Sequence, residues 1–339
     1  MSPEQLKDVG VVVIGRNEGE RLRRCLQSLP SKVNGVYVDS GSSDGSQDLA
    51  ASSGLDVVDL KIPPNFTAAR ARNAGIARLL QRNPGLRFVQ VIDGDCELDP
   101  GWMQSARAAL LADSRFAVVF GRRRERFPNA SVYNRMCDDE WDVPVGEAQS
   151  CGGDALFRIS PLVAVGGYTE AMIAGEEPDL CLRMRAQGWR VQRIAAEMTR
   201  HDAAIVRYGQ WWRRARRGGH AFAELVCRHG SCSDPHWIRE IVSMSAWSVI
   251  ALGGVFAVSA GTLLGHPAVL TGGWTLIALF SLQVSRLAWR KSRSGTPLGL
   301  AASWALLLMT GKLAQTQGAI EYCLRRLLRR SGTIIEYKT

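Results

Sequence analysis

The 339-residue sequence lacks several motifs that would assign a function at once. No Gly-x-Gly-x-x-Gly follows its first apolar run and no Gly-x-x-x-x-Gly-Lys-Ser/Thr occurs anywhere, which argues against a dinucleotide fingerprint and a P-loop. Its eight cysteines include no Cys-x-x-Cys pair, so neither a zinc site nor a disulfide framework is indicated. The cysteines are therefore expected to be reduced cytosolic thiols.

The first residues, MSPEQLKDVG, lack the basic start and apolar stretch of a secretory signal. We therefore expect no signal peptide and a first domain that stays in the cytoplasm. The net charge is +10, but no nucleic-acid motif accompanies it, and the arginines cluster in 200–217, 286–293 and 325–330, beside apolar segments. Anionic membrane lipid is the expected partner of this charge, and nucleic acid is not.

Two apolar segments, 241–265 and 267–285, contain no Asp, Glu, Lys or Arg. Each is long enough to cross the hydrocarbon core of a bilayer, and only a short Gly-His-Pro link separates them. We predict a transmembrane helical hairpin over 241–288. By the positive-inside rule, the arginines on both sides of it face the cytoplasm. The predicted location is the inner (cytoplasmic) membrane, crossed more than once, with the first domain on the cytoplasmic side.

A third apolar stretch, 297–311, is short and is followed by a Leu/Ile stripe facing arginines. If it crossed the membrane, Arg325, Arg326, Arg329 and Arg330 would lie outside, against the positive-inside rule. We predict a re-entrant or interfacial segment that continues into a basic amphipathic tail, so that 297–339 form a third region. A true third span is the alternative.

Short β-branched runs alternate with amphipathic stretches in the first part of the chain. The runs predict strands, and the stretches between them predict helices. Strands are expected at 9–14, 36–38, 57–60, 88–92, 116–120 and 155–160, and helices at 17–30, from 43 or 44 onward, at 68–80, up to 111 and at 177–187. This alternation predicts an α/β domain with a largely parallel sheet, over about 1–230. The charged, irregular stretch 121–150 is interpreted as an acceptor-side insertion.

The run FVQVIDGD at 88–95 ends at two carboxylates, Asp93 and Asp95, separated by one glycine. In sheets of this kind ligands bind beyond the carboxyl ends of the strands. Two nearby carboxylates suit a hard divalent cation, for which Gly94 would allow a sharp turn. An aspartate-rich turn without a metal is the alternative.

Four further segments accompany VIDGD in a fixed order: VVIGRNEGERLRRCLQSL, VYVDSGSSDGSQDLA and ARARNAG before it, and AGEEPDLCLRMRAQGW after it. With them the sequence resembles, from about residue 11 to 219, the family 2 glycosyltransferases of the GT-A fold. The resemblance implies a Rossmann-like mixed sheet, a nucleotide-diphosphate sugar as donor, and transfer with inversion at the anomeric centre.

The resemblance also implies where the nucleotide binds. It places Asn17 and Glu18 at the end of the first strand, close to the nucleotide. It places Asp39 and Asp44 in contact with the base and ribose, because a carboxylate can accept hydrogen bonds from a ring N–H or from ribose hydroxyls. For Asp44, a helix N-cap is the alternative role.

Other residues that match the family imply contacts with the diphosphate and with its cation. Arg72 and Asn73 match the family's Arg-Asn pair, and Arg72 would donate charge-assisted hydrogen bonds to a diphosphate oxygen. Asp93 and Asp95 match its Asp-x-Asp motif and imply Mg²⁺ or Mn²⁺, with Asp95 as the direct ligand. Asp154 matches a position near the acceptor and the donor sugar.

Inverting transfer needs a base that takes the proton of the acceptor hydroxyl. The resemblance places it at Glu177, where the family usually has Asp, and Glu176 and Asp179 are competing candidates. With Pro178 as the first helical residue, Glu177 would lie at a helix N-terminus, whose dipole favours an ionised carboxylate. A purely structural N-terminal charge is the alternative.

The segment RYGQWWRRARRGG at 207–219 matches the family's Gln-x-x-Arg-Trp motif only in part. Gln210 and Arg213 fit a contact with the diphosphate, but Arg214 replaces the tryptophan. Residues 200–230 are alternatively an interfacial helix, with Trp211 and Trp212 at headgroup depth.

These observations predict a glycosyltransferase that moves a sugar from a nucleotide-diphosphate donor to a lipid-linked or membrane-embedded acceptor. Cell-envelope polysaccharide or glycolipid synthesis is the expected setting. The alternative is a membrane-anchored protein that binds sugar nucleotides, or serves as a scaffold, without turnover. Glu177 and the altered Gln-x-x-Arg-Trp motif are its only support in the sequence.

Overall fold

The computed structural model describes residues 6–61 and 66–328. Arg329, Arg330 and the residues after them, the last part of the predicted basic tail, lie outside the described residues. The chain separates into two compact units: Met1–Pro128 with Cys137–Ala204, and Asn129–Met136 with Ile205–Thr339. Residues 205–230, which the sequence analysis assigned to the first domain, therefore cluster with the C-terminal helices.

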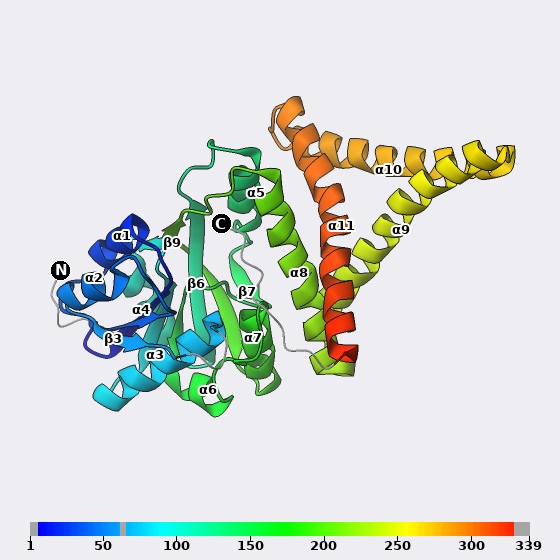
Figure 1. Ribbon diagram of the computed structural model, residues 1–339. Coiled ribbons are helices and arrows are strands. Elements are labelled where there is room, and N and C mark those ends of the chain that lie inside the picture. Colours follow the sequence, from blue (N-terminus) through cyan, green and yellow to red (C-terminus); the bar gives the residue numbers. More distant parts are fainter. Residues whose placement is uncertain (1–5, 62–65, 329–339) are drawn as a thin grey trace. The chain divides into compact units, whose positions relative to one another are not determined.

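A nine-stranded mixed sheet forms the centre of the first unit (Figure 1). In space the strands follow the order β3-β2-β1-β4-β8-β6-β9-β5, and β7 pairs with β9. Their bounds are β1 (Val9–Gly15), β2 (Asn34–Asp39), β3 (Asp56–Asp59), β4 (Phe88–Asp93), β5 (Cys96–Leu98), β6 (Phe116–Glu125), β7 (Gly146–Ala148), β8 (Ala155–Arg158) and β9 (Arg190–His201).

Helices cover the sheet of the first unit. They are α1 (Glu20–Ser28), α2 (Ser46–Ser52), α3 (Ala68–Arg82), α4 (Trp102–Ala112), α6 (Ile159–Ala164) and α7 (Glu176–Ala186), while α5 (Val132–Glu140) has residues in both units. Because crossovers between parallel strands are right-handed, the reversal of strand order at β1 and β4 puts α3 on the face opposite α1 and α2. Helix α3 lies so close to β1 and β2 that a Cβ on Gly75 would collide with Val12 and Val38.

Strands β3, β2, β1 and β4 run parallel and form the half of the sheet that the sequence predicts best. All but the last residue of β1, VGVVVIG, are buried, as expected for a strand covered on both faces. The register aligns Gly15 of β1 with Asp39 of β2, and Ile14 with Asp93 of β4. The carboxyl ends of these three strands therefore meet at one edge.

The other half of the sheet departs from the prediction of a largely parallel sheet. Strand β8 is antiparallel to β4 and β6, and β5 and β7 are antiparallel to β9. The stretch 121–150 is not irregular throughout, since β6 continues to Glu125 and α5 and β7 follow. Strand β9 was not predicted because its sequence, RVQRIAAEMTRH, mixes charged and apolar residues without a clean period.

The second unit consists largely of helices: α8 (Tyr208–His229), η2 (Gly230–Cys232), α9 (Pro235–Leu264), α10 (Pro267–Arg293) and α11 (Leu298–Leu327). Gly265 ends α9 in the left-handed conformation with φ of 63°, and Pro267 starts α10 at its first position. This turn chemistry produces the predicted helical hairpin. Helices α9 and α10 are both long and apolar enough to cross a membrane, and little of either apolar stretch is buried.

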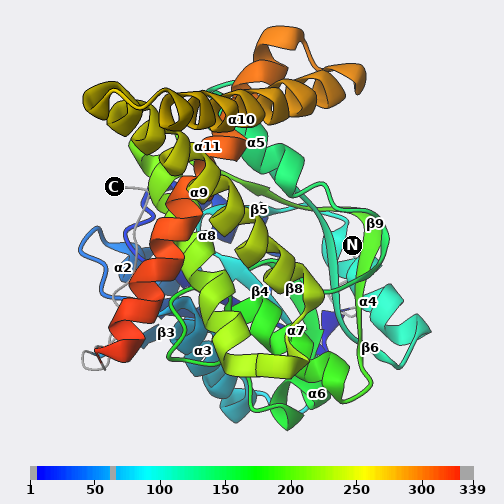
Figure 2. The same cartoon turned by 90° about the vertical axis from the view of Figure 1, so that its right-hand side faces the viewer.

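Helix α11 is one unbroken helix that packs along both α8 and α9 (Figures 1 and 2). Polar contacts join it to α9, including the ion pair Lys312–Glu240 at 2.7 Å and a hydrogen bond between Ser248 and Thr316 at 2.9 Å. On the α8 side, Trp212 Nε1 donates to Gln317 Oε1 at 2.9 Å. How α11 lies in a membrane stays a prediction.

Candidate functional site

The site is built around the turn between β4 and β5, where the two predicted carboxylates lie. Asp93 is the last residue of β4 and Cys96 the first of β5, so Gly94 and Asp95 form the turn. Gly94 is needed for its lack of a side chain rather than for a left-handed backbone, since its φ is not positive and a Cβ would lie 3.1 Å from Ile14 O. Its N–H donates to the same oxygen at 2.8 Å, which ties the turn to β1.

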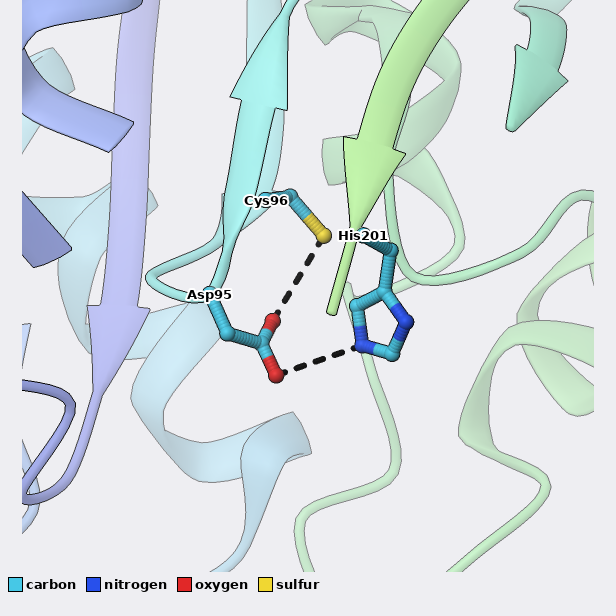
Figure 3. A group of neighbouring side chains, drawn as sticks. All are labelled: Asp95, Cys96 and His201. Carbon is cyan, nitrogen blue, oxygen red and sulfur yellow. Dashed lines mark hydrogen bonds and ion pairs between the residues drawn. The ribbon is translucent and has the colours of Figure 1, made fainter. Parts of the chain in front are cut away.

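Asp95, Cys96 and His201 form a buried group at this turn (Figure 3). The antiparallel register of β5 and β9 sets Cys96 opposite His201. His201 Nε2 then lies 3.2 Å from Asp95 Oδ2, and Cys96 Sγ lies 3.5 Å from Asp95 Oδ1. One potential ligand atom from each residue lies within 4.8 Å of the others.

The electrostatics of this group suit a cation held by a carboxylate and an imidazole. Burial, and then the nearby Arg123, lower the pKa of His201 to about 4, so the ring is neutral near pH 7 and has a lone pair to offer. Burial raises the pKa of the Cys96 thiol, which disfavours a thiolate ligand. Trp141 meets the His201 ring edge-on at 4.9 Å between centroids and holds its orientation. The donor set, Asp95 and His201, fits a divalent ion such as Mn²⁺.

Asp93 has different partners from Asp95. Its Oδ1 accepts from Arg72 Nη2 at 3.0 Å, and Arg123 Nη2 lies 3.7 Å from its Oδ2. Burial opposes the charge of Asp93, but the two guanidinium groups outweigh it and lower its pKa to about 2. In this structure Asp95 contacts the His201 imidazole and Asp93 contacts the two arginines. That both carboxylates share one ion stays a prediction.

Arg72 connects Asp93 to the start of helix α7. Its Nη1 donates to Glu176 Oε1 and to Glu177 Oε1, each at 2.9 Å. The guanidinium was expected to face a diphosphate, but only 2% of the side chain is exposed. Its hydrogen bonds go to three carboxylates of the protein, so the structure places it between the functional groups rather than at the opening of the site.

Glu177 is the most exposed of the three candidate bases. Helix α7 begins at Glu176 after Gly175, two residues earlier than Pro178, so Glu177 still lies in the first turn, where the helix dipole acts. Burial, and then the charge of Glu176, raise the pKa of Glu177 to about 7 despite Arg72. A carboxylate with such a pKa is well matched to proton abstraction near neutral pH.

The two competing candidates are more enclosed. Asp179 is 2% exposed, and its Oδ2 accepts from Thr169 Oγ1 at 2.7 Å and from Arg183 Nη2 at 2.7 Å. Glu176 is 3% exposed and pairs with Arg72. Both carboxylates support the start of α7.

Asp154 lies beneath the turn and is completely buried. Its Oδ1 accepts from Asp93 N at 3.0 Å, and its Oδ2 accepts from Arg123 Nη2 at 2.6 Å and from Thr199 Oγ1 at 2.9 Å. The carboxylate has no exposed surface in this structure and joins β4, β6 and β9 below the site. Its place near the acceptor and the donor sugar stays a prediction.

Two loops meet at the carboxyl ends of β1 and β2. Asn17, with a positive φ of 53°, accepts from Ser43 N through Oδ1 at 2.8 Å, and its own N–H donates to Ser42 Oγ at 2.9 Å. Asp44 Oδ2 accepts from Gly19 N at 2.9 Å. Asn17 and Asp44 are both exposed, so they fasten the loops together and still present polar surface.

Asp44 also contacts the start of α2, although the helix begins later than residue 43 or 44. Its Oδ1 accepts from Ser46 N at 3.1 Å, and the helix N-cap is Gly45. Asp39 is fully buried and accepts from the N–H groups of Gly41 and Ser42 through Oδ2. Burial opposes the charge of Asp39, but hydrogen bonds from Ser42, Gln47 and Tyr37 outweigh it and lower the pKa of this carboxyl.

The remaining predicted residues also have protein partners. Glu18 forms an ion pair with Arg21 at 2.9 Å. Asn73 forms two hydrogen bonds to the backbone of Tyr168, in the loop before α7. Its Nδ2 donates to Tyr168 O and its Oδ1 accepts from Tyr168 N, each at 2.9 Å. In the second unit, Gln210 Oε1 accepts from the N–H groups of Val206 and Arg207 and caps α8.

Arg213 also lies on α8, so the predicted contacts of Gln210 and Arg213 with a diphosphate stay predictions. Trp211 is 4% exposed and packs against Tyr133 and Tyr208. Its ring is therefore covered by protein side chains, and the predicted position of Trp211 and Trp212 at headgroup depth stays a prediction.

Two residues of the site were missed by the sequence analysis, His201 and Arg123. Both come from the half of the sheet that mixes parallel and antiparallel pairs, on β9 and β6. A single histidine near the end of a mixed-charge run carries no specific signal. Only the pairing of β9 with β5 places it beside Asp95.

Part of the chain matches a known protein family. Residues 10–150 match the family model described as glycosyl transferase family 2. This part of the chain is similar to the family 2 glycosyltransferases. The matched segment contains the β4–β5 turn, whereas His201 and the start of α7 lie beyond it.

The sequence is also similar to the pre-mycofactocin glycosyltransferases of two Mycobacterium tuberculosis strains, CDC 1551 / Oshkosh and ATCC 25618 / H37Rv. Each is 28% identical over 278 residues, which cover 78% of this chain. The aligned part spans 57% of the length of those relatives.

The GT-A fold is confirmed by a solved structure. The mannosyltransferase PcManGT from Pyrobaculum calidifontis, in complex with GDP-Man and Mn²⁺, superposes with a TM-score of 0.56 at 18% identity. The match covers 93% of this chain and 87% of the other.

Proposed function

We propose that this chain is an inverting glycosyltransferase that transfers a sugar from a nucleoside-diphosphate donor with the help of a divalent cation. The observation that carries the proposal is the pairing of Glu177 with Asp93 through Arg72, which joins an acidic helix start to the Asp-x-Asp turn. A base and a cation site must lie on either side of the reacting carbon in such a transfer. The glycosyltransferase names of the relatives, and the GDP-Man and Mn²⁺ of the Pyrobaculum enzyme, support it.

Asp95 and His201 are the proposed holders of the cation. When bound, the ion would neutralise the charge that develops on the departing nucleoside diphosphate. The imidazole favours Mn²⁺ over Mg²⁺, because Mg²⁺ prefers oxygen ligands. Asp93, held by Arg72 and Arg123, fixes the backbone of the turn that carries Asp95.

Glu177 is the proposed general base. Its carboxylate accepts the proton of the acceptor hydroxyl as the oxygen attacks the anomeric carbon, and the bond from that carbon to the diphosphate oxygen breaks on the opposite face. The first turn of α7 and Arg72 both favour the ionised carboxylate that this role needs. Asn17, Asp39 and Asp44 are proposed to shape the nucleoside end of the site from the β1 and β2 loops.

The acceptor is proposed to be lipid-linked or membrane-embedded. Helices α9 and α10 have the length and composition of membrane spans, and basic residues lie in the last turn of α10, where a cytoplasmic face would bear anionic lipid. A transferase anchored in this way meets acceptors of the same membrane. Synthesis of an envelope polysaccharide or a glycolipid at the cytoplasmic face of the inner membrane is the setting that this location favours.

The experiment is donor turnover by the purified full chain in lipid nanodiscs. GDP-mannose and a set of UDP-sugars are supplied with Mn²⁺ and extracted membrane lipid, and released nucleoside diphosphate and glycolipid are measured. The proposal expects metal-dependent release that Asp95→Asn removes. The matched control is Asp48→Asn, which removes an exposed carboxylate on α2.

The opposite result would identify a binding protein. If the chain binds a sugar nucleotide with Mn²⁺, measured calorimetrically, but neither hydrolyses nor transfers it with any lipid fraction, the enzymatic proposal is wrong.

A further inference from the structure

Arg72 is the one described side chain whose hydrogen bonds reach both acidic parts of the site. It comes from α3, Asp93 ends β4, and Glu177 begins α7, so three elements meet at one guanidinium. Both of its terminal nitrogens donate hydrogen bonds to carboxylates of the protein. Nη2 donates to Asp93 Oδ1 at 3.0 Å, and Nη1 donates to Glu177 Oε1 at 2.9 Å. Glu176 shares Nη1 at the same distance.

The surroundings of Arg72 close it off from a ligand. The side chain is 2% exposed, and its guanidinium carbon lies over the Tyr168 ring at 5.4 Å from the centroid. Asn73, the next residue, holds Tyr168 through two hydrogen bonds to its backbone. The Arg-Asn pair thus contacts the loop before α7 at two points, and with 2% of the Arg72 side chain exposed little of its guanidinium is open to a diphosphate oxygen.

We propose that Arg72 is a positioning residue that sets the distance between the proposed base Glu177 and the cation-bearing turn, and that it does not bind the donor. This inference rests on the proposed function, since it assigns a role within that same site. The planar guanidinium suits the task because its fork can hold carboxylates from two directions at fixed angles. A lysine ammonium would keep the charge and lose that geometry.

Gly153 provides a second, independent way to disturb the same geometry. A Cβ added there would meet Arg72 Nη2 and Asp93 Oδ2, each at 2.8 Å, and Glu177 Oε1 at 3.4 Å. These atoms are the ends of side chains, so the network would shift while the backbone stays. Gly153→Ala therefore moves the three groups apart without removing any charge.

The test compares Arg72→Lys, Gly153→Ala and wild type in the full chain, with the sugar nucleotide that wild type turns over. The control is Arg78→Lys, an equivalent change on the same helix at an ion pair with Asp56 away from the site. Measured are kcat, the donor KM, and the affinity for the corresponding nucleoside diphosphate with Mn²⁺ by calorimetry. Thermal unfolding of each variant reports the folded fraction.

A positioning role predicts that both site variants lose kcat by about 10- to 100-fold, the usual effect of a small misplacement of catalytic groups. Donor KM and nucleoside-diphosphate affinity should stay within about threefold of wild type, and Arg78→Lys should change neither. A donor-binding role predicts instead that Arg72→Lys raises KM and weakens the nucleoside diphosphate, while Gly153→Ala spares kcat. Either of those results, or unchanged kcat in both site variants, overturns the inference.

Failure of the inference and failure of the proposed function are distinguishable. If wild type itself never turns over a sugar nucleotide, the proposed function fails, and the inference with it. If wild type is active and the variants behave as donor-binding mutants, only the role of Arg72 changes. Should Arg72→Lys not fold, Gly153→Ala decides the question alone, because it keeps every charge of the network.

Discussion

His201 Nε2 lies 3.2 Å from Asp95 Oδ2, in a contact that joins the end of β9 to the turn before β5. A ligand that binds only the folded state raises the stability of that state. If this pair holds Mn²⁺, the ion should therefore stabilise the chain. Mn²⁺ should raise the thermal unfolding midpoint of the wild type in the presence of a nucleoside diphosphate. His201→Ala should weaken the apparent Mn²⁺ affinity by at least about tenfold.

The control for that prediction is His220→Ala, which removes another buried histidine, on α8 of the second unit. This variant should lower the midpoint without metal to a similar degree, because it also truncates a buried side chain, but it should keep the rise with Mn²⁺. An equal loss of the Mn²⁺ effect in both variants would show that His201 does not hold the ion.

The pH dependence of transfer should report the proposed base. Because the pKa of Glu177 is raised to about 7, the folded chain keeps this proton up to neutral pH, and the basic form is lost as the pH falls through 7. We expect kcat/KM to decline below about pH 7 with a slope of one. If the base had an unshifted carboxyl pKa of roughly 4 to 5, kcat/KM would stay unchanged from neutral pH down to that range. Such a pH profile would contradict the assignment of Glu177 as the base.

Asp154 should matter for stability more than its exposed neighbours do. Asp154→Ala leaves the partly buried Arg123 without its closest carboxylate and removes the acceptor of Thr199. The expected loss is about 3–5 kcal/mol in the free energy of unfolding, measured by urea denaturation. Glu197→Ala, which breaks a half-exposed ion pair with Arg124, should cost less than about 1 kcal/mol. Equal losses would show that Asp154 does not support the turn.

Adjacent glycines on α8 offer an internal comparison. A Cβ on Gly219 would collide with the backbone of Gln315 on α11, whereas one on Gly218 would meet nothing within 4 Å. Gly219→Ala should therefore destabilise the chain by about 1–3 kcal/mol through overpacking. Gly218→Ala should stabilise it by up to about 1 kcal/mol through helix propensity. Thermal unfolding in detergent measures both, and the same sign for the two variants would contradict the close approach of α8 and α11.

The parallel half of the fold was predictable because its signals are local. The buried run of β1 and the FVQVIDGD segment each predict a strand, as found. The register of β1 with β4 then brings Asp93 to the edge of the sheet that the sequence indicated. The same holds for the hairpin of α9 and α10, whose turn is set by Gly265 and Pro267.

The roles of individual site residues were less predictable, because a motif identifies a position and not its contacts. Arg72 matches a family arginine, yet only the fold shows that carboxylates from β4 and α7 surround it. Asp154 is likewise in the site's neighbourhood and has no exposed surface. His201 depends on strand pairing between residues more than a hundred positions apart, and no local pattern encodes such a register.

The central claim is that Glu177 takes the proton of the acceptor in a metal-dependent transfer. The most direct measurement is sugar transfer by Glu177→Gln beside wild type, with the affinity for the sugar nucleotide and Mn²⁺ determined on the same preparations and Glu20→Gln, an exposed carboxylate on α1, as control. We predict that Glu177→Gln abolishes transfer and keeps donor affinity within about threefold, while the control transfers normally. Transfer by Glu177→Gln at the wild-type rate would contradict the claim and move the role to Glu176 or Asp179.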